Sequence, residues 1–233
     1  MRLVAWNANY NNKRRSLEET VGLLAHLHAD VLVISETAPP AGGNPLNARW
    51  IGAAAPGLAI VTRDGVELIA HPANADAPTL MGGFDVQGDT GFHLLAMWPV
   101  QRAGDHSYHQ VLMAGLDRFG DWLSDGPSLM AGDFNSSTRV TSQRHSHGKF
   151  IARADALGLA SVYHELTGEP HGEETVATYR HNATETGRFH IDYCFASRPL
   201  AEAASLSVLS SEPWPGLSDH FPLVVDVADV LFA

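Results

Sequence analysis

The first part of the chain alternates short apolar runs with one segment of helical periodicity. The stretches "RLVAWN" and "DVLVISE" are continuous apolar runs of strand length, and each ends in polar residues. Between them, Ser16 and Glu19 match a capping box at the start of a helix. The apolar stripe of that helix is formed by Leu17, Val21, Leu24 and His28. The pattern predicts a strand, a helix over 16–28 and a second strand.

The rest of the chain is rich in predicted strands. A second helix is predicted over about 108–123, where Leu112, Leu116, Phe119 and Leu123 share one face, and it leads into the buried strand "SLMAG". Other short runs are separated by Gly, Pro, Asn and Asp, which is typical of strands joined by turns. They are "GLAIVTR", "VELIAHP", "GGFDVQG", "FHLLAMWP", "FHIDYCFAS", "SLSVLSS" and "FPLVVDV". The segment "TAPPAGGNPLNA" is expected to be a surface loop.

Length and composition favour one large domain. The chain has 233 residues and 45% hydrophobic content, enough to fill a sizeable core, and it has no fixed repeat or long linker. We therefore expect a single domain over residues 1–233. The 26 acidic and 15 basic residues give a formal charge of −11, which argues against a general nucleic-acid coat protein.

The sequence predicts neither a signal peptide nor a membrane span, and it contains no cysteine motif. The start, "MRLVAWNANYNNKRR", has too few apolar residues for a signal-peptide core, and no run approaches the ~18 apolar residues of a membrane span. We expect a cytoplasmic monomer without membrane association. Cys194 is the only cysteine, so no intrachain disulfide can form. Thirteen histidines suggest zinc, but neither HExxH nor CxxC occurs, which disfavours a zinc site.

Polar residues gather where the predicted strands begin and end. They are Asn7 and Asn9 after the first strand, Glu36 after the second, Asp133 and Asn135 after "SLMAG", Asp192 in "FHIDY", and Asp219 with His220 before "FPLVVDV". Carboxylates and carboxamides at one end of a sheet offer the hard oxygen ligands that Mg²⁺ prefers. Taken singly, these residues could be caps, Asx turns or solvated loop residues. For the cluster to have no functional role, one of these structural explanations would have to hold for every residue in it at the same time.

The ordered motifs resemble the endonuclease/exonuclease/phosphatase superfamily. "WNANY" with "ISE", "AGDFNSS", "FHIDYCFAS" and "LSDHFPL" follow the order and approximate spacing of that superfamily from Arg2 to Val227. The resemblance implies an α+β fold, a four-layer αββα sandwich of two packed β-sheets between helices, with the site at one edge. It also implies a metal-dependent phosphoric ester hydrolase that uses Mg²⁺, with Mn²⁺ as a second option.

The resemblance also assigns roles to the clustered residues. Glu36 is implied as the principal metal ligand, and Asn7, Asn9 and Asp219 complete the shell directly or through water. Asp133 is the candidate for orienting or deprotonating the attacking water. Asn135 is expected to donate to a phosphate oxygen, and Asn7 is included among the catalytic residues.

His220 is expected to act with Asp192, whose carboxylate would hold the imidazole in one tautomer and favour its charged form. Two roles for His220 stay open, general base and cationic phosphate clamp, beside the alternative of a capping or core histidine. Thr178 in "VATYRHN" resembles a family position near the site and is a substrate-binding candidate.

One stretch departs from the better-known family members. Where many relatives carry a histidine or tyrosine, this chain has Met97, Trp98 and Pro99. The phosphate-contacting side chain expected there is either missing or supplied by His106, Tyr108 or His109, and Tyr108 is the substrate-binding candidate. Trp98 is expected to be a core aromatic rather than a platform for stacking bases.

Several basic residues stand beside the motifs. Lys13, Arg14 and Arg15 precede Ser16, Arg139, Arg144 and Lys149 follow "GDFNSS", and Arg180 and Arg188 flank the approach to "FHIDY". We expect Lys13, Arg14, Arg15, Arg139 and Arg144 to bind a nucleic-acid substrate, DNA or RNA. The alternatives are a solvated loop at 13–15, a small phosphorylated metabolite as substrate, and a catalytically silent binding module. The silent module is disfavoured because the whole set of polar residues is present.

Overall fold

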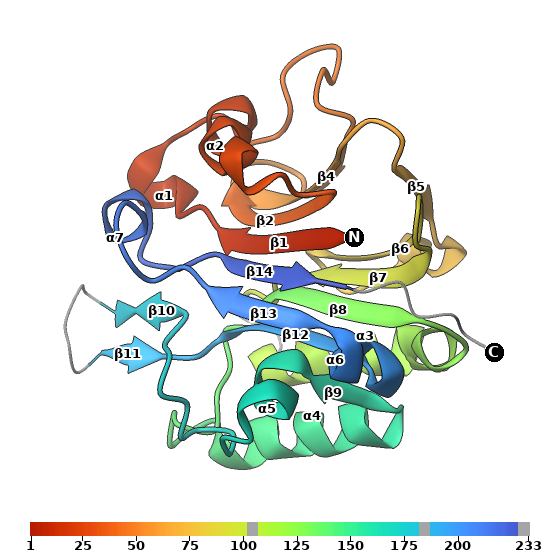
Figure 1. The fold of residues 1–233 in the computed structure, drawn as a ribbon, viewed down its shortest axis with the longest axis vertical. Coiled ribbons are helices and arrows are strands. Elements are labelled where there is room, and N and C mark those ends of the chain that lie inside the picture. The colour runs from red at the N-terminus through yellow and green to blue at the C-terminus, as the bar shows by residue number, and fades with distance from the viewer. Residues whose placement is uncertain (102–106, 182–186, 228–233) are drawn as a thin grey trace.

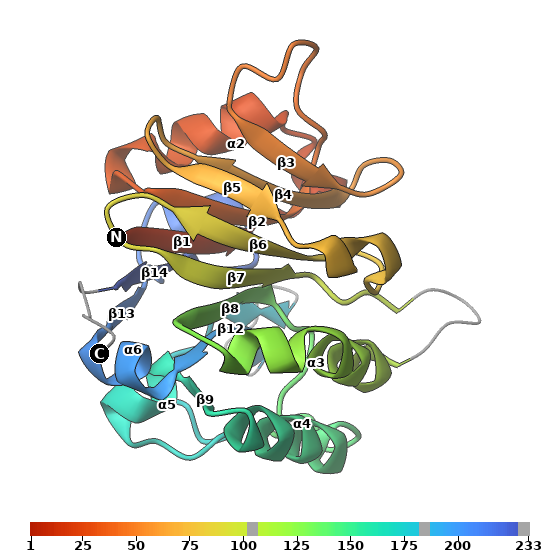
Figure 2. The same ribbon diagram turned by 90° about the vertical axis from the view of Figure 1, so that its right-hand side faces the viewer.

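Two six-stranded β-sheets pack face to face and carry helices on their outer surfaces (Figures 1 and 2). The computed structural model describes residues 1–101, 107–181 and 187–227. The four layers confirm the α+β sandwich expected from the sequence. In the described part of the chain, no helix combines the length and apolar character needed to cross a bilayer.

The first sheet has the strand order β13-β14-β1-β2-β4-β3, with β1 and β2 parallel and the other neighbours antiparallel. Its strands are β1 (Arg2–Asn7), β2 (Val31–Thr37), β3 (Ala48–Ile51), β4 (Gly57–Thr62), β13 (Ser205–Val208) and β14 (Leu223–Asp226).

The second sheet has the order β5-β6-β7-β8-β12-β9, with β7 and β8 parallel. Its strands are β5 (Glu67–Ala70), β6 (Met81–Gln87), β7 (Phe92–Met97), β8 (Ser128–Asp133), β9 (Leu159–Ser161) and β12 (Asp192–Ser197). The short strands β10 (Tyr179–Arg180) and β11 (Arg188–Phe189) pair with each other.

The helices cover the outer faces of both sheets (Figure 2). The α-helices are α1 (Tyr10–Lys13), α2 (Leu17–Leu24), α3 (Tyr108–Ser124), α4 (Arg144–Ala156), α5 (Val162–Thr167), α6 (Arg198–Ala203) and α7 (Trp214–Leu217). Two short 3₁₀ segments are η1 (Ala25–Leu27) and η2 (Pro72–Asp76).

Each central strand is buried on both faces, which explains its unbroken apolar sequence. In β1, Leu3 and Ala5 join the core between the two sheets, whereas Val4 and Trp6 pack toward the outer helices. In the second sheet, α3 packs its apolar stripe against the outward side chains of β7 and β8, among them Leu95 and Met130. Because successive side chains of a strand point to opposite faces, each central strand contributes to the core between the sheets and to a core under the outer helices.

Two local expectations differ from the structure, and several helices were not expected. The first helix keeps its Ser16–Glu19 capping box but ends at Leu24, and His28 adopts a left-handed φ of 51° after the 3₁₀ turn. The run "FHIDYCFAS" is broken at 190–191 into β11 and β12, because the amides of Ile191 and Asp192 donate to Thr178 Oγ1 instead of a strand. Helices α1, α4, α5, α6 and α7 were not predicted.

Strand direction brings distant motifs to one edge. Asn7 ends β1, Glu36 lies near the end of the parallel strand β2, and Asp133 ends β8. Asp192 begins the antiparallel β12 and stands directly opposite Asp133 in the register. His220 precedes β14, which runs antiparallel to β1. All five positions therefore meet at the side where α1, α7 and β10–β11 lie in Figure 1.

Gly132 is required by close strand packing beside this edge. It has a φ of +142°, and a Cβ placed there would lie 2.0 Å from the carbonyl oxygen of Met97 on β7. We expect Gly132→Ala to lower the free energy of unfolding by roughly 2 kcal/mol or more, because backbone rather than a flexible side chain must move.

Denaturant unfolding checks this expectation. Gly22→Ala is the matched control, since an added Cβ at Gly22 in α2 meets nothing within 4 Å and alanine is favoured in a helix by roughly 0.5–1 kcal/mol. A Gly132→Ala variant as stable as the wild type would contradict the packing described here.

Candidate active site

Asn7 joins two carboxylates from different sheets. Its Nδ2 donates to Oε1 of Glu36 at 3.2 Å and to Oδ2 of Asp133 at 2.9 Å. Its Oδ1 accepts from the backbone amide of Asn9 at 2.9 Å. Asn7 is 1% exposed, so its orientation is fixed by these bonds and by the strand. The side chain thereby holds two negative groups close together.

Asn9 and Asp219 form the neighbouring wall of the site. Asn9 Nδ2 donates to Oδ1 of Asp219 at 2.7 Å, and Asn12 Nδ2 donates to Oδ1 of Asn9 at 2.7 Å. Ser218 connects this wall to β1, because its hydroxyl donates to the carbonyl of Asn7 at 2.8 Å and accepts from the amide of His220 at 3.1 Å. The "SDH" motif is thus tied to the end of the first strand.

Asn135 orients Asp133. The backbone amide of Asn135 donates to Oδ1 of Asp133 at 2.9 Å, and its Nδ2 lies 3.2 Å from Oδ2. The same Nδ2 lies 3.1 Å from the carbonyl oxygen of Pro99. The side chain therefore holds Asp133 in place, while its expected donation to a phosphate oxygen stays a prediction.

Asp192 and His220 form a buried dyad. Nδ1 of His220 lies 2.9 and 3.1 Å from the two carboxylate oxygens of Asp192, and Nε2 points toward Oδ2 of Asp133 at 4.0 Å. Thr178 supports the dyad from behind, since its Oγ1 accepts from the amide of Asp192 at 3.0 Å. The imidazole thus stands between two carboxylates from adjacent strands.

The protonation of this group is set by burial and charge. Burial opposes the charged imidazolium, but Asp192, Asp133 and Asp219 outweigh it and raise the pKa of His220 to about 10. Burial and the charge of Asp192 raise the pKa of Asp133 to about 7. Burial also raises the pKa of Glu36, partly offset by the Asn7 hydrogen bond. His220 is therefore cationic at neutral pH.

Three site residues occupy the left-handed region of backbone space. Asn9, Glu36 and Asn135 have φ values of 52°, 48° and 51°. Glu36 falls where the pairing of β2 with β4 shifts register between Ile34 and Thr37. A non-glycine residue in this conformation costs free energy, and such residues cluster at functional sites. For Glu36, the irregularity directs the carboxylate into the site.

The charge balance fits a bound divalent cation. Four carboxylates converge here, from Glu36, Asp133, Asp192 and Asp219. Among the described residues, His220 is the cation paired with Asp133 and Asp192, and no ion pair of Glu36 or Asp219 is observed. With the carboxamides of Asn7 and Asn9 alongside, Glu36 and Asp219 provide the hard oxygen donors that Mg²⁺ prefers.

Asp133, Asp192 and His220 form a second possible ligand set, whose donor atoms lie within 4.8 Å of one another. In this set, Nδ1 of His220 is already hydrogen-bonded to Asp192, so it is not free to bind an ion.

The substrate-binding candidates are placed unevenly around the site. Tyr108 is half-buried at the start of α3, and burial followed by the charges of Asp133 and Glu36 raises its pKa, which places the phenol near both carboxylates. Arg139 is exposed beyond β8, with its guanidinium carbon 6.0 Å from the centre of the Phe189 ring. Arg144 is exposed at the start of α4, where Nε donates to the carbonyl of Thr138 at 3.1 Å.

Two expected substrate contacts also have structural bonds. Thr178 is 0% exposed and its Oγ1 accepts from the amide of Asp192, so its side chain supports the dyad, while its contact with substrate stays a prediction. Arg15 donates to the carbonyls of Ala8 and Leu217 at 3.1 and 2.7 Å, and burial lowers its pKa. Lys13 is exposed and donates to the carbonyl of Gly216 at 2.9 Å.

The remaining candidates near the site differ in exposure. Arg14 is exposed, with its guanidinium carbon 5.2 Å from the centre of the Tyr10 ring, so it stays a substrate-binding prediction. Trp98 is buried in the core between the sheets, which confirms a core aromatic. His106 lies outside the described residues, and His109 is half-buried in α3.

Tyr179 was not predicted from the sequence. Its ring centre lies 4.5 Å from that of His220, and burial and four nearby carboxylates raise its pKa to about 12. The phenol is therefore a neutral donor that covers the imidazole. Its position next to Thr178 in "VATYRHN" was the available signal.

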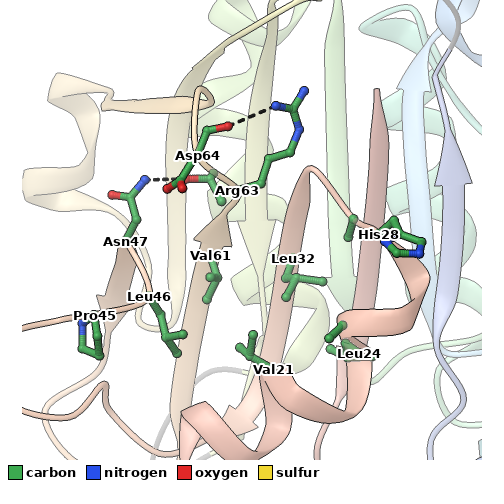
Figure 3. Close-up of a pocket in the computed structure, with 13 residues that line it drawn as sticks. Val21, Leu24, His28, Leu32, Pro45, Leu46, Asn47, Val61, Arg63 and Asp64 are labelled. Carbon is green, nitrogen blue, oxygen red and sulfur yellow. Dashed lines mark hydrogen bonds between the residues drawn. The ribbon is translucent and has the colours of Figure 1, made fainter.

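A pocket on the outer side of the first sheet lies away from this edge (Figure 3). It is lined by apolar side chains of α2, β2 and β4, including Val21, Leu32 and Val61, with Arg63 and Asp64 at its margin. These strand positions are at the end of the sheet opposite to Glu36, so the pocket is separate from the carboxylate cluster.

A sandwich with a carboxylate, carboxamide and Asp–His cluster at its edge defines a metal-dependent phosphoric ester hydrolase. The sequence matches the profile of the Endonuclease/Exonuclease/phosphatase family over residues 4–220, and the chain belongs to that family. No curated protein sequence matches the chain.

Solved structures share the fold at low sequence identity. An AP endonuclease from Archaeoglobus fulgidus is 19% identical with a TM-score of 0.70, covering 99% of this chain and 100% of that one. The 3'-5' exonuclease NExo from Neisseria meningitidis is 21% identical with a TM-score of 0.71, covering 97% and 99%. The endonuclease domain of TRAS1, a telomere-specific non-LTR retrotransposon, is 16% identical with a TM-score of 0.68, covering 98% of both chains.

The raised pKa of His220 gives a test by unfolding at different pH. The folded protein holds a proton on His220 up to about pH 10, whereas the unfolded chain releases it near 6.5. The stabilisation is complete below 6.5 and is lost as pH rises toward 10. In chelator-treated protein, we expect the wild type to lose stability relative to His220→Gln by up to about 1.4 kcal/mol per pH unit in that window.

The exposed His26 provides the control, because His26→Gln makes the same substitution outside the active site. Parallel curves for the wild type and His220→Gln between pH 6.5 and 10 would show that His220 is not held in its charged form.

Proposed function

We propose that this chain is a Mg²⁺-dependent phosphodiesterase that cleaves nucleic acid, DNA or RNA. The observation that carries the proposal is the position of Asp133, between the cationic His220 on one side and Asn7 with Glu36 on the other. A phosphodiester placed at this point meets a proton acceptor, a cation and a set of hard oxygen ligands together.

Each residue supplies one requirement of phosphodiester hydrolysis. The Asp133 carboxylate accepts the proton of the attacking water, with Asn7 and Asn135 holding both of its oxygens in place. The His220 imidazolium donates from Nε2 to a non-bridging phosphate oxygen, and Asp192 keeps the ring charged and oriented. These assignments make His220 a phosphate clamp rather than a general base.

Glu36 and Asp219, with Asn7 and Asn9 directly or through water, would hold the metal. When bound, the ion supplies neutralisation of phosphoryl charge and stabilisation of the leaving oxygen. Mg²⁺ suits this oxygen-rich set better than a metal that selects imidazole or thiolate ligands, and Mn²⁺ is the closest substitute.

Two observations support nucleic acid as the substrate. Arg139 and Arg144 lie on exposed surface in the segments that follow Asp133, and we expect them to contact phosphates beyond the scissile one. Structures with the same fold include a variant of NExo from Neisseria, described as a 3' phosphatase bound to product DNA hairpin, with 20% identity, 98% and 99% coverage and a TM-score of 0.72.

A small phosphorylated metabolite is the second candidate. The formal charge of −11 weakens long-range attraction of a polyanion, and Arg15 is committed to backbone carbonyls. Substrate size therefore has to be tested apart from the chemistry.

The metal assignment is tested by Glu36→Gln. Activity should need Mg²⁺ or Mn²⁺ and vanish with EDTA, and the substitution should reduce turnover by at least about 10²-fold because it removes the charged ligand while keeping the shape. Turnover of bis-p-nitrophenyl phosphate, with circular dichroism to verify folding, provides the measurement. Full activity in EDTA rules out the metal role.

The substrate assignment is tested by the double variant Arg139→Ala/Arg144→Ala. On duplex DNA or RNA it should raise KM and flatten the slope of log affinity against log salt by up to ~0.9 per lost duplex phosphate contact. Turnover of bis-p-nitrophenyl phosphate should stay unchanged, because that diester is too short to reach either side chain.

Arg118→Ala/Arg153→Ala is the charge-matched control, since both arginines are surface residues paired with Asp76 and Asp117. Equal effects of the two double variants on nucleic acid would exclude a local contact. No cleavage of nucleic acid, with retained turnover of the small diester, would favour the metabolite.

A further inference from the structure

A second cluster of chemically active side chains lies outside the active site. It comprises His147 in α4, His164 in α5, His171 and Glu174 in the segment between α5 and β10, and His190 just before β12. The ring centres of His164 and His171 lie 3.5 Å apart and stacked, those of His164 and His190 5.9 Å apart, and those of His147 and His171 6.1 Å apart. We call these five residues the histidine cluster.

Three of the imidazoles are oriented in the same manner. Nδ1 of His147 lies 2.9 Å from the Ser136 hydroxyl, and Nδ1 of His164 lies 2.7 Å from the Ser161 hydroxyl. Nδ1 of His190 lies 2.9 Å from the carbonyl oxygen of Val176. Metal-binding histidines commonly use one ring nitrogen in this way, which fixes the tautomer and presents the other nitrogen to the ion.

Four side-chain atoms of the histidine cluster are buried with no hydrogen-bond partner among the described residues. They are Nε2 of His147, Nε2 of His190, Nδ1 of His171 and Oε2 of Glu174. His147 and His190 are 0% and 1% exposed. Burying an unsatisfied polar atom is costly, and four of them in one cluster need a common explanation. The hydrogen bond between His164 Nε2 and Glu174 Oε1 at 3.2 Å involves two other atoms, so it does not provide partners for these four.

The protonation states suit metal ligation. Burial and the neighbouring His164 lower the pKa of His171 to about 3, and burial lowers the pKa of His147 to about 4. Burial opposes the charge of Glu174, but bonds from His164 and backbone amides outweigh it and lower its pKa to about 2. Neutral imidazoles beside an ionised carboxylate are the forms that bind a cation.

We propose that His164, His171 and Glu174 form a site for a divalent transition-metal ion of the Zn²⁺ type, with His147 and His190 as further imidazole donors. The donor atoms of the first three residues all lie within 4.8 Å of one another. Ligands at about 2.0–2.2 Å around one tetrahedral ion lie about 3.3–3.6 Å apart, so the three donor atoms would move together by up to about 1.5 Å when the ion binds. Imidazole donors favour Zn²⁺ over Mg²⁺.

A route for the ion is present, and the site would have a structural role. A surface pocket bounded by Gly148, Ile151, Gly168 and His171 opens beside His164. Through the bonds described above, the histidine cluster connects the segments that carry Ser136, Val176 and His190. These segments lead to Asn135, Thr178 and Asp192, so a metal here would stabilise the supports of the active site without taking part in its reaction.

The test is equilibrium dialysis of chelator-treated protein against Zn²⁺ in excess Mg²⁺, with zinc counted by mass spectrometry. We expect one Zn²⁺ per chain, a rise of several degrees in Tm with Zn²⁺ but not with Mg²⁺, and visible absorption bands on binding Co²⁺. His171→Asn and Glu174→Gln should each lower the affinity for Zn²⁺ by at least about 10-fold, because each removes one ligand.

Two control variants locate the ion. Glu36→Gln, in the active site, and His93→Asn, a surface histidine paired with Asp85, should both retain Zn²⁺. The X-ray absorption spectrum of Zn²⁺ in the wild type should show imidazole scattering, which keeps the proposal testable where a variant does not fold. Absence of stoichiometric Zn²⁺ in the wild type overturns the proposal. So does Zn²⁺ retained at native affinity in folded His171→Asn and Glu174→Gln, or lost in Glu36→Gln alone.

Discussion

The side-chain amide of Asn7 is the contact on which the active site depends. One nitrogen donates to Glu36 on a strand of the same sheet and to Asp133 on the facing sheet, so the ends of the two sheets are joined at the site. The same side chain accepts from the amide of Asn9, which sets the next wall. Without this donor, the half-buried Glu36 carboxylate and the buried Asp133 carboxylate would face each other with no hydrogen-bond donor between them, and their repulsion would oppose the close approach of the two sheets at the site.

The remaining charge is balanced in two different ways. On one side His220 stays protonated between Asp192 and Asp133, an internal cation held by a dyad. On the other side no ion pair of Glu36 or Asp219 is observed among the described residues, which leaves a negative region for a hard cation. Asn9, Glu36 and Asn135 adopt a left-handed backbone conformation that costs free energy but points their side chains into the site. The surrounding sheets are buried on both faces and are rigid enough to hold this conformation. The site is therefore assembled at the expense of local stability.

Much of this arrangement could be predicted from the sequence, because its signals are contiguous. Apolar runs that end in Asn7, Glu36 and Asp133 indicate buried strands and their functional ends. The order of the motifs indicated the four-layer fold.

Properties that depend on residues far apart in the sequence could not be predicted. Thr178 supports the dyad because the break before β12 turns two amides onto its hydroxyl. Arg15 is committed to a carbonyl of α7, 202 residues away in the sequence. Helix α4 escaped detection because its buried face includes a histidine, His147, beside Phe150 and Ala154. The histidine cluster escaped for a related reason, since its members are spread over four segments and match no short metal-binding motif.

The central claim is that the carboxylate cluster binds its cation on the Glu36 side, with His220 serving as a separate charged group. A crystal soaked with Mn²⁺ and measured for anomalous scattering tests this most directly, because the peak marks the ion itself. The account predicts a peak beside the Glu36 carboxylate, within ligand distance of Asp219 or the carboxamides of Asn7 and Asn9 directly or through water. A peak between Asp133, Asp192 and His220, with none at Glu36, would contradict it.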